Sequence, residues 1–412
     1  MQALLANVPT LGELIPIPDL ARVACMLELP PETQALLEAA GELHLERWCS
    51  FFTTTQCRFM NLLRFKSTGR RARVITRVMA NLGDVAGLRA AHEVGCPWDS
   101  RVIRNAVCHG HIECLRYAFE NGCPWFQRVG EYPTIAARCG QLDVLMFVRS
   151  HGCRWDELTC ANAAMHGAVD CLRYAHENGC PWDTRTTMWA ALGGYPECLR
   201  YAHENGCPWT PVTTRNAASW GHLACLQYAH ENGCEWDPLT CLCAAINGQL
   251  DCLRYAHEHG CPLHPRVCQQ SALHGHLDCL QYAHENGCPW HADTCAYASL
   301  NGHLDCLRYA HENGCPWDGG ACTYAALNGH LECLRYAHEN GCPWDHATIG
   351  HAATNGRLEC LRYAHENGCP WDGRTYIRAT QSGHRGCMQY ARTRMVDPPR
   401  PDLPEDRRRR GF

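Results

Sequence analysis

Apolar residues recur along most of this chain with the period of a helix, and glycines interrupt them at regular intervals. In the segment that follows Gly167, Leu172 and Ala175 share one stripe with Gly179, at spacings of 0, 3 and 7. Charged residues of alternating sign occupy a second face of the same segment. The pattern predicts an amphipathic helix that ends at Gly179, because Pro181 forbids its continuation.

A second helix is predicted after the turn. Asp183 can accept hydrogen bonds from the first backbone N–H groups of the segment TRTTMWAAL, which ends at the glycine pair 193–194. Nothing in the unit alternates as a β-strand does. A helix pair this short cannot bury its own apolar stripe, so neighbouring units must supply the core, as in a solenoid.

The same unit recurs with a period of 27 residues. One glycine series follows the motif NGC from Gly95 to Gly368, and a second follows the motif NGH from Gly83 to Gly383. Both series contain a single step of 30 residues, because three extra residues lie between Pro124 and Gly140. The two series predict about twelve units over residues 74–394, and they leave 1–70 and 395–412 outside the repeat.

Charge and hydropathy exclude several classes of protein. The 412 residues carry 37 Lys and Arg against 42 Asp and Glu, so no basic excess indicates nucleic-acid binding. No apolar run approaches 18 residues, which is too short for a membrane-spanning helix. The first twenty residues lack a cationic segment before an apolar one, so a signal peptide is not expected.

The 32 cysteines are the unusual feature of the composition, and 21 of them occupy two positions of the repeat. Cysteine is a small side chain that is often fully buried, so packing between repeats is the favoured interpretation. The two positions are represented by Cys171, Cys198, Cys225, Cys252, Cys279, Cys306, Cys333 and Cys360, and by Cys180, Cys207, Cys234, Cys261, Cys288, Cys315, Cys342 and Cys369.

A metal site is the alternative for these cysteines, since eight units contain Cys-x4-His-x3-Cys, as at Cys171, His176 and Cys180. A step of five residues turns the side chain away from the helix face, whereas zinc ligands favour other spacings. Disulfides between equivalent positions would need Cα atoms closer than about 7 Å, while packed helices lie about 8–10 Å apart. We therefore expect no metal, no cofactor and reduced thiols, which are typical of an intracellular protein.

Tryptophan and histidine also follow the repeat. Ten of the thirteen tryptophans lie two residues after the cysteine of the turn, eight of them after a Cys-Pro pair, and we expect them to pack the turn edge rather than bind a ligand. The histidines equivalent to His176 replace an aliphatic residue, and we expect them to be buried, neutral and hydrogen-bonded along the stack. No nucleophile, acid pair or glycine-rich phosphate loop stands outside the repeat, so no enzyme is predicted.

The unit AALNGHLECLRYAHENGC at residues 325–342 resembles the ankyrin repeat. The usual ankyrin period is 33 residues, and the six missing residues fall where that family places its β-hairpin finger. The resemblance implies an all-α solenoid of about twelve stacked ankyrin-like helix-turn-helix repeats, with the hairpin shortened or absent. The CPWD motif is also similar to ankyrin-repeat proteins of giant DNA viruses of amoebae.

The segment after the WD motif varies most between units, and it includes the position five residues before each NGH glycine. By the ankyrin resemblance this position faces the concave groove, and a row rich in aromatic residues and arginine suits protein binding, although ordinary surface variation is the alternative. Trp189, Tyr297 and Tyr324 are the preferred anchors. The candidate binding residues are Asn105, Asn162, Trp189, Asn216, Gln270, Tyr297, Tyr324, His351 and Arg378.

The two ends of the chain differ from the repeats. Residues 1–70 predict several helices, and a Pro-Asp-Leu start with Trp48 about 30 residues on is weakly similar to an F-box, which docks the Skp adaptor of cullin ubiquitin ligases. A helical cap over the first repeat is the alternative. Residues 395–412 predict disorder, and Arg407 to Arg410 resemble a nuclear localisation signal.

These observations predict a monomeric, non-enzymatic scaffold of the cytoplasm or nucleus that binds a partner protein, which would be a host protein if the chain is viral. A substrate adaptor of a ubiquitin ligase is the alternative, and a metal-binding thiol array is a third.

Overall fold

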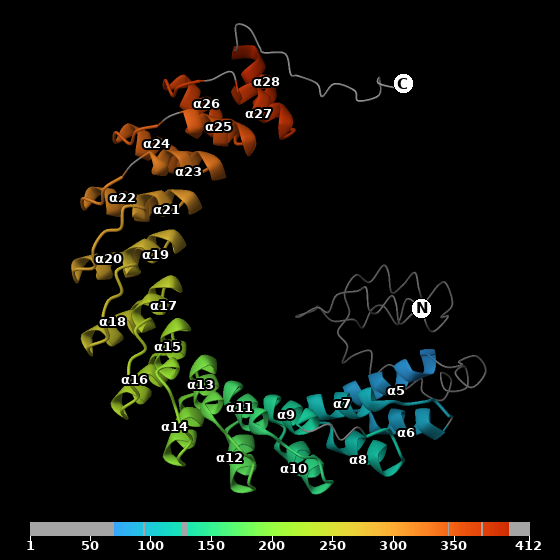
Figure 1. Cartoon of the computed structure of the whole chain (residues 1–412). Coiled ribbons are helices and arrows are strands. Elements are labelled where there is room, and N and C mark those ends of the chain that lie inside the picture. The colour runs from blue at the N-terminus through green and yellow to red at the C-terminus, as the bar shows by residue number, and fades with distance from the viewer. Residues whose placement is uncertain are drawn as a thin grey trace, which may run out of the picture. The chain divides into compact units, whose positions relative to one another are not determined.

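The computed structural model describes residues 70–93, 95–125, 130–317, 319–344, 346–371 and 374–394. These residues form 24 α-helices, labelled α5 to α28, and no strand (Figure 1). The predicted all-α repeat architecture is therefore confirmed. The predictions for the helical or F-box-like segment 1–69 and for the tail 395–412 lie outside the described residues.

Each repeat supplies one odd-numbered helix, here called the first helix, and one even-numbered helix, the second helix. The first helices are α5 (Arg70–Leu82), α7 (Ser100–His109), α9 (Glu131–Arg138), α11 (Glu157–Met165), α13 (Thr184–Gly193), α15 (Val212–Ser219), α17 (Thr240–Ile246), α19 (Val267–His274), α21 (Thr294–Asn301), α23 (Gly320–Asn328), α25 (His346–Thr354) and α27 (Arg374–Gln381). The second helices are α6 (Val85–Glu93), α8 (Ile112–Glu120), α10 (Leu142–Ser150), α12 (Val169–Glu177), α14 (Pro196–Glu204), α16 (Leu223–Glu231), α18 (Leu250–Glu258), α20 (Leu277–Glu285), α22 (Leu304–Glu312), α24 (Leu331–Glu339), α26 (Leu358–Glu366) and α28 (Arg385–Arg394).

Glycine turns end the helices as the sequence predicts. At the end of α12 the N–H of Gly179 donates to the carbonyl of His176, and the N–H of Cys180 donates to that of Ala175, both at 2.9 Å. This is the Schellman arrangement, and it requires the left-handed backbone that Gly179 adopts at a φ of +79°. The carboxylate of Asp183 then accepts from the N–H of Arg185 at 2.9 Å, which caps α13 as expected.

The described residues divide into two compact units, one of residues 70–186 and 201–207 and the other of residues 187–200 and 208–394. In the first unit α5, α7, α9 and α11 contact one another in order. In the second unit the first helices from α15 to α27 form one row of consecutive contacts, and the second helices from α16 to α28 form another (Figure 1). Each unit is thus a double row of helices, which is the stacking that the repeat predicts.

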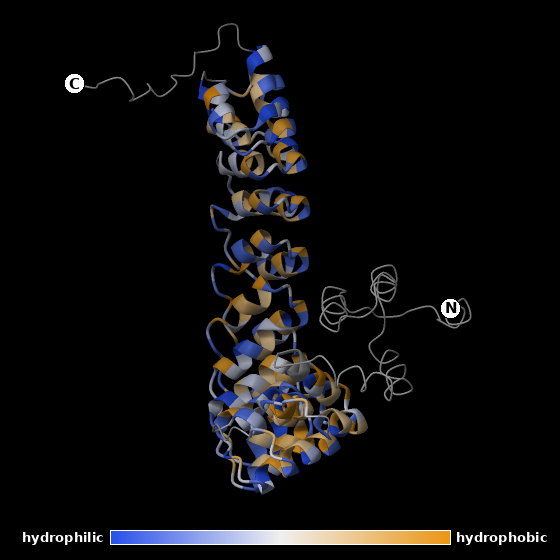
Figure 2. Ribbon diagram, turned by 90° about the vertical axis from the view of Figure 1, so that its right-hand side faces the viewer, coloured by the Kyte–Doolittle hydropathy of each residue, from blue (hydrophilic) through white to orange (hydrophobic). Residues whose placement is uncertain are grey.

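The core of every repeat is built from small and aliphatic side chains. On α12, Cys171, Leu172 and Ala175 are at most 1% exposed, and the other second helices repeat this trio with few exceptions. Figure 2 shows apolar and polar residues side by side on individual helices, as expected for amphipathic elements. No helix in the described part of the chain combines the length and the apolar character that crossing a membrane would need.

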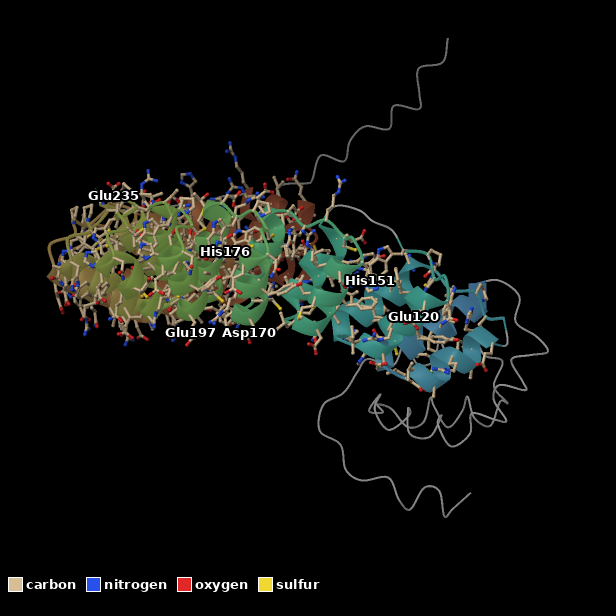
Figure 3. All side chains as sticks on the ribbon, turned by 90° about the horizontal axis from the view of Figure 1, so that it is seen from below. Glu120, His151, Asp170, His176, Glu197 and Glu235 are labelled. Atoms are coloured by element: carbon tan, nitrogen blue, oxygen red, sulfur yellow. The ribbon has the colours of Figure 1, made fainter. Side chains whose placement is uncertain are left out.

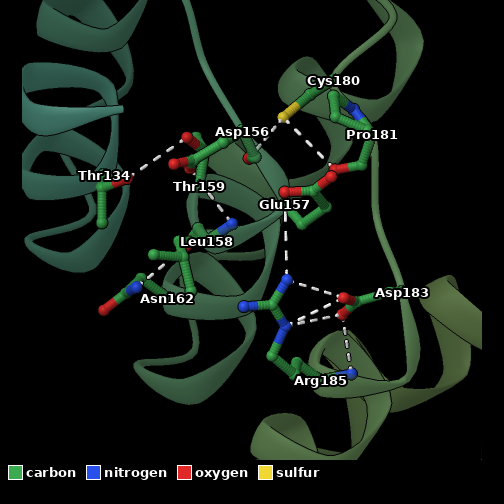
Figure 4. Close-up of polar contacts among 10 residues, drawn as sticks. All are labelled: Thr134, Asp156, Glu157, Leu158, Thr159, Asn162, Cys180, Pro181, Asp183 and Arg185. Carbon is green, nitrogen blue, oxygen red and sulfur yellow. Dashed lines mark hydrogen bonds and ion pairs between the residues drawn. The ribbon is translucent and has the colours of Figure 1, made fainter. Parts of the chain in front are cut away.

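The cysteine of the turn has a role beyond filling space. The thiol of Cys180 donates to the carbonyl of Asp156 in the preceding repeat at 3.3 Å (Figure 4). Cys207 makes the same contact with Asp183 at 3.3 Å. An aliphatic residue of this size could not donate to that carbonyl, so the contact explains why sulfur recurs here. The prediction that these cysteines are buried between repeats is confirmed.

Candidate protein-binding face

The nine predicted binding residues all lie on first helices, one on each of α7, α11, α13, α15, α19, α21, α23, α25 and α27. Tyr324 and His351 are exposed, and the other seven are half-buried. The two equivalent residues on α9 and α17 are Ile135, which is buried, and Cys243, which is half-buried. We call the nine residues the first-helix row. Their side chains are accessible, and whether they bind a partner stays a prediction.

Several members of the row reach the first helix of the preceding repeat. The amide of Asn105 donates to the carbonyl of Arg77 at 3.0 Å, and that of Asn216 donates to the carbonyl of Met188 at 3.3 Å. The guanidinium of Arg378 lies over Gly350, where any side chain would overlap it. Within each unit the row therefore bridges neighbouring first helices.

Asn162 behaves differently from the other two asparagines of the row. Its amide donates to the carbonyl of Leu158 on its own helix at 2.9 Å (Figure 4). The nearby hydroxyl groups of Thr134 and Thr159 lie 3.3 Å apart and join α9 to α11. The three asparagines thus stabilise the backbone, which leaves the aromatic members of the row as its best candidate anchors.

Trp220 was missed by the sequence prediction, although it is the most exposed large apolar side chain that the structure describes, at 63%. It caps α15 one turn after Asn216, at the position directly before an NGH glycine. Trp189 on α13 and the 38% exposed Tyr195 lie in the same unit. The available signal was that Trp220 is one of few tryptophans outside the Cys-Pro-Trp turns.

The residue directly before the NGH glycine makes different contacts in different repeats. It is an asparagine in four other repeats. Asn301 and Asn328 each donate to a carbonyl 28 residues earlier at 2.7 Å, whereas Asn247 and Asn355 donate to a carbonyl of their own helix. The carbonyl 28 residues before Trp220 belongs to Leu192, and it accepts from Nε2–H of His222 at 3.1 Å.

Ion pairs attach the turns to the first helices. Arg215 on α15 pairs with Asp237 at 3.1 Å, and Arg77 on α5 pairs with Asp99. Arg185 pairs with Asp183 at 2.7 Å (Figure 4). The hydrogen bond from Arg77 lowers the pKa of Asp99, and that from Arg185 lowers the pKa of Asp183. These arginines are neutralised by their partners and give the first helices no basic patch.

The second helices carry a regular aromatic lattice. The imidazole of His176, labelled in Figure 3, stacks on the indole of Trp182 with ring centroids 3.7 Å apart. Its Nδ1 lies 3.0 Å from the hydroxyl of Tyr201 in the next repeat, and Arg173 lies over that tyrosine ring at 5.6 Å. The same His–Tyr contact recurs at His92–Tyr117, His230–Tyr255, His257–Tyr282, His284–Tyr309, His311–Tyr336, His338–Tyr363 and His365–Tyr390.

Two expectations about this lattice are confirmed and one is wrong. The tryptophans pack the turn, and the histidines are hydrogen-bonded along the stack. The histidines are half-buried rather than buried, because they lie in the last turn of the second helices, directly before an exposed glutamate. The lattice therefore joins repeats, and it leaves the first helices as the face on which residues vary.

The cysteines and histidines do not converge on a common point. Cys180 points to the carbonyl of Asp156, while His176 faces Tyr201. Among the described residues, no group of three or more His, Cys, Asp or Glu side chains is arranged to hold a metal ion. Every cysteine in those parts of the chain is a free thiol.

Comparison with known families adds one finding. The family model described as ankyrin repeats in many copies matches residues 292–338 and 322–365, which span α21 to α26. Residues 292–365 therefore match ankyrin repeats, and the same helix pair recurs through the rest of the described residues. Ankyrin repeats as a class mediate protein–protein interaction and are typically non-enzymatic. No curated protein matches the chain.

Proposed function

We propose that this chain is a non-enzymatic, monomeric scaffold that binds a partner protein through the concave face of its repeats, residues 74–394, inside the cell. The observation that carries the proposal is the accessible first-helix row, which varies between repeats while the second helices keep one lattice. Aromatic residues and arginine dominate the energy of protein interfaces. Trp189, Tyr297 and Tyr324 provide such anchors on the first helices, and the exposed Trp220 caps another of them.

The rigidity of the helix ends supports binding by a preformed surface. Schellman turns, capping aspartates and side-chain bridges between repeats fix the first helices before any partner arrives. A surface that is ordered in advance loses little conformational entropy on binding. We therefore expect the partner to bind the first-helix row without a change in the conformation of the row.

Affinity capture with the full chain tests this proposal. We expect the triple variant Trp189→Ala, Tyr297→Ala, Tyr324→Ala to lose the partner that the natural chain captures, with an unchanged circular dichroism spectrum. Met146→Ala is the matched control, because Met146 is 44% exposed but lies on the second helix α10. Equal capture by the natural chain and the triple variant would refute the assignment of the row.

The F-box-like sequence of residues 1–70 supports a second candidate function, in which the captured host protein is presented for ubiquitination. Co-purification of the Skp adaptor, lost on deletion of residues 1–60, is the expected result. Retention of the adaptor by the deleted chain would contradict it.

A further inference from the structure

Cys108 and Cys139 form a thiol pair that repeat packing does not explain. Their Sγ atoms lie 3.6 Å apart, between the last turn of α7 and the C-cap of α9. Neither residue occupies a position where cysteine recurs in the repeat. Both are half-buried, whereas Cys114 and Cys123 in the same region are buried. The pair is thus accessible in a way that the packing cysteines are not.

The contact between the two thiols is fixed by the register of the repeats. In two repeats the residue before the NGH glycine reaches the end of the preceding first helix, since Asn301 donates to the carbonyl of Leu273 and Asn328 to that of Leu300. Cys139 stands in the same relation to Cys108, and the three inserted residues change the offset from 28 to 31. The contact therefore follows from how α7 and α9 pack, and the two helices do contact each other.

We propose that Cys108 and Cys139 are a redox site, at which a peroxide converts the two thiols into a disulfide that links α7 to α9. The 3.6 Å contact must shorten to the S–S bond length of about 2 Å, which is a movement that side-chain rotation can supply. The pairing joins non-equivalent positions, so the expectation against disulfides between equivalent cysteines does not apply to it.

The chemistry balances with hydrogen peroxide as the two-electron oxidant. One thiolate attacks a peroxide oxygen, the O–O bond breaks, and a sulfenic acid forms, while the leaving hydroxide takes up the proton that this thiol had lost and becomes water. The second thiolate attacks that sulfur, the S–S bond forms and the S–O bond breaks, and the leaving hydroxide takes up the proton of the second thiol to give a second water. Two thiols and one hydrogen peroxide thus give one disulfide and two waters.

The groups around Cys139 determine the rate of disulfide formation, because they determine the pKa of its thiol. Burial raises the pKa of Cys139, the neighbouring Cys108 raises it further, and Arg138 opposes both effects. Because the thiolate is the reactive form, disulfide formation is expected to be slow at neutral pH and to accelerate as the pH rises. Cys160 and Cys180, which are at most 4% exposed, are expected to stay reduced throughout.

The disulfide would also constrain one end of the first-helix row. Asn105 lies one turn before Cys108 on α7, and Ile135 lies one turn before Cys139 on α9. A covalent bond at the ends of these helices would hold them together at the junction that contains the inserted residues. The redox site itself does not depend on the proposed partner-binding function.

Mild oxidation of the reduced full chain tests the proposal. Hydrogen peroxide is added under native conditions, the remaining thiols are alkylated, and digested peptides are identified by mass spectrometry. We expect a peptide linked through Cys108 and Cys139 that dithiothreitol separates, and a higher thermal unfolding midpoint for the oxidised chain. Cys108→Ser and Cys139→Ser should each abolish both effects, whereas Cys243→Ser, a half-buried control on α17, should keep them.

Three results would overturn the proposal. Peroxide could leave both thiols free, or it could oxidise one of them to a sulfinic acid without a cross-link. The main disulfide could also join other cysteines in the natural chain and persist in Cys108→Ser.

Discussion

Glycine serves two purposes in this chain: it allows left-handed backbone, and it leaves room for a neighbouring side chain. Two glycines of one repeat allow these two effects to be measured separately. Gly248 and Gly260 both have left-handed backbone, with φ of +70° and +91°. A Cβ atom added at Gly260 meets nothing within 4 Å, whereas one at Gly248 would lie 2.5 Å from Nδ1 of His276. The pair is therefore a matched test, because both positions share the backbone strain and only Gly248 has the close neighbour.

The expected losses of stability follow from these contacts. Gly260→Ala should lower the free energy of local unfolding by about 1–2 kcal/mol, the cost of left-handed backbone for an L residue. In Gly248→Ala the imidazole of His276 must also move, which breaks the bond that its Nε2–H donates to the carbonyl of Ile246 at 3.1 Å. That bond adds about 0.5–1.5 kcal/mol, so the total is about 1.5–3.5 kcal/mol.

Hydrogen exchange measured by mass spectrometry over α17 to α20 is the assay, because long repeat arrays need not unfold in one step. The double variant Gly248→Ala, His276→Ala supplies the control. The double variant lacks the imidazole that clashes with the new Cβ. Its loss of unfolding free energy should therefore be smaller than the sum of the two single losses by about 0.5–1.5 kcal/mol. Equal losses for the two single glycine variants, or full additivity in the double variant, would show that the approach of His276 does not matter.

Three further predictions concern the core, the lattice and pH. Leu307→Ala, at a fully buried position of α22, should cost about 2–5 kcal/mol in the same exchange assay, against almost nothing for Met146→Ala. Tyr363→Phe should cost about 0.5–1.5 kcal/mol by removing the hydroxyl that lies 3.1 Å from His338, and stability equal to the natural chain would contradict that. Burial raises the pKa of Cys252 from 9.0 to about 12, and this favours the neutral folded thiol. Its contribution is complete below pH 9 and declines above it, so the thermal midpoint should fall in alkaline solution, and less steeply in Cys252→Val.

Much of the fold could be predicted from local signals in the sequence. Gly179, Pro181 and Asp183 each specify a backbone conformation within a few residues, so the ends of α12 and α13 lie where these residues indicated. The 27-residue period then multiplied one helix pair into a stack. Burial of Cys171 and Cys180 was also predictable, because their positions recur on the apolar side of every unit.

Contacts between repeats could not be predicted in the same way. The bond between His176 and Tyr201 joins residues 25 apart, and the thiols of Cys108 and Cys139 are 31 apart. A comparison of equivalent positions, 27 or 30 residues apart, does not reveal either offset. Both follow from how one helix pair is displaced against the next, which is a property of packing. The exposure of Trp220 was missed for the same reason, since the exposed fraction of a side chain also depends on how the helices pack.

The second helices hold neighbouring repeats together, whereas the first helices carry the exposed residues of the row. This difference limits where substitutions can be tolerated. A substitution in the lattice, such as one at Tyr201, removes a contact that a neighbouring repeat needs, because His176 depends on its hydroxyl. A substitution at Tyr324 or His351 leaves the side chains of adjacent repeats in place, since both residues are exposed. Repeats can therefore diverge on their first helices while the stack stays intact. This separation allows a nearly invariant unit to carry a surface that differs from repeat to repeat.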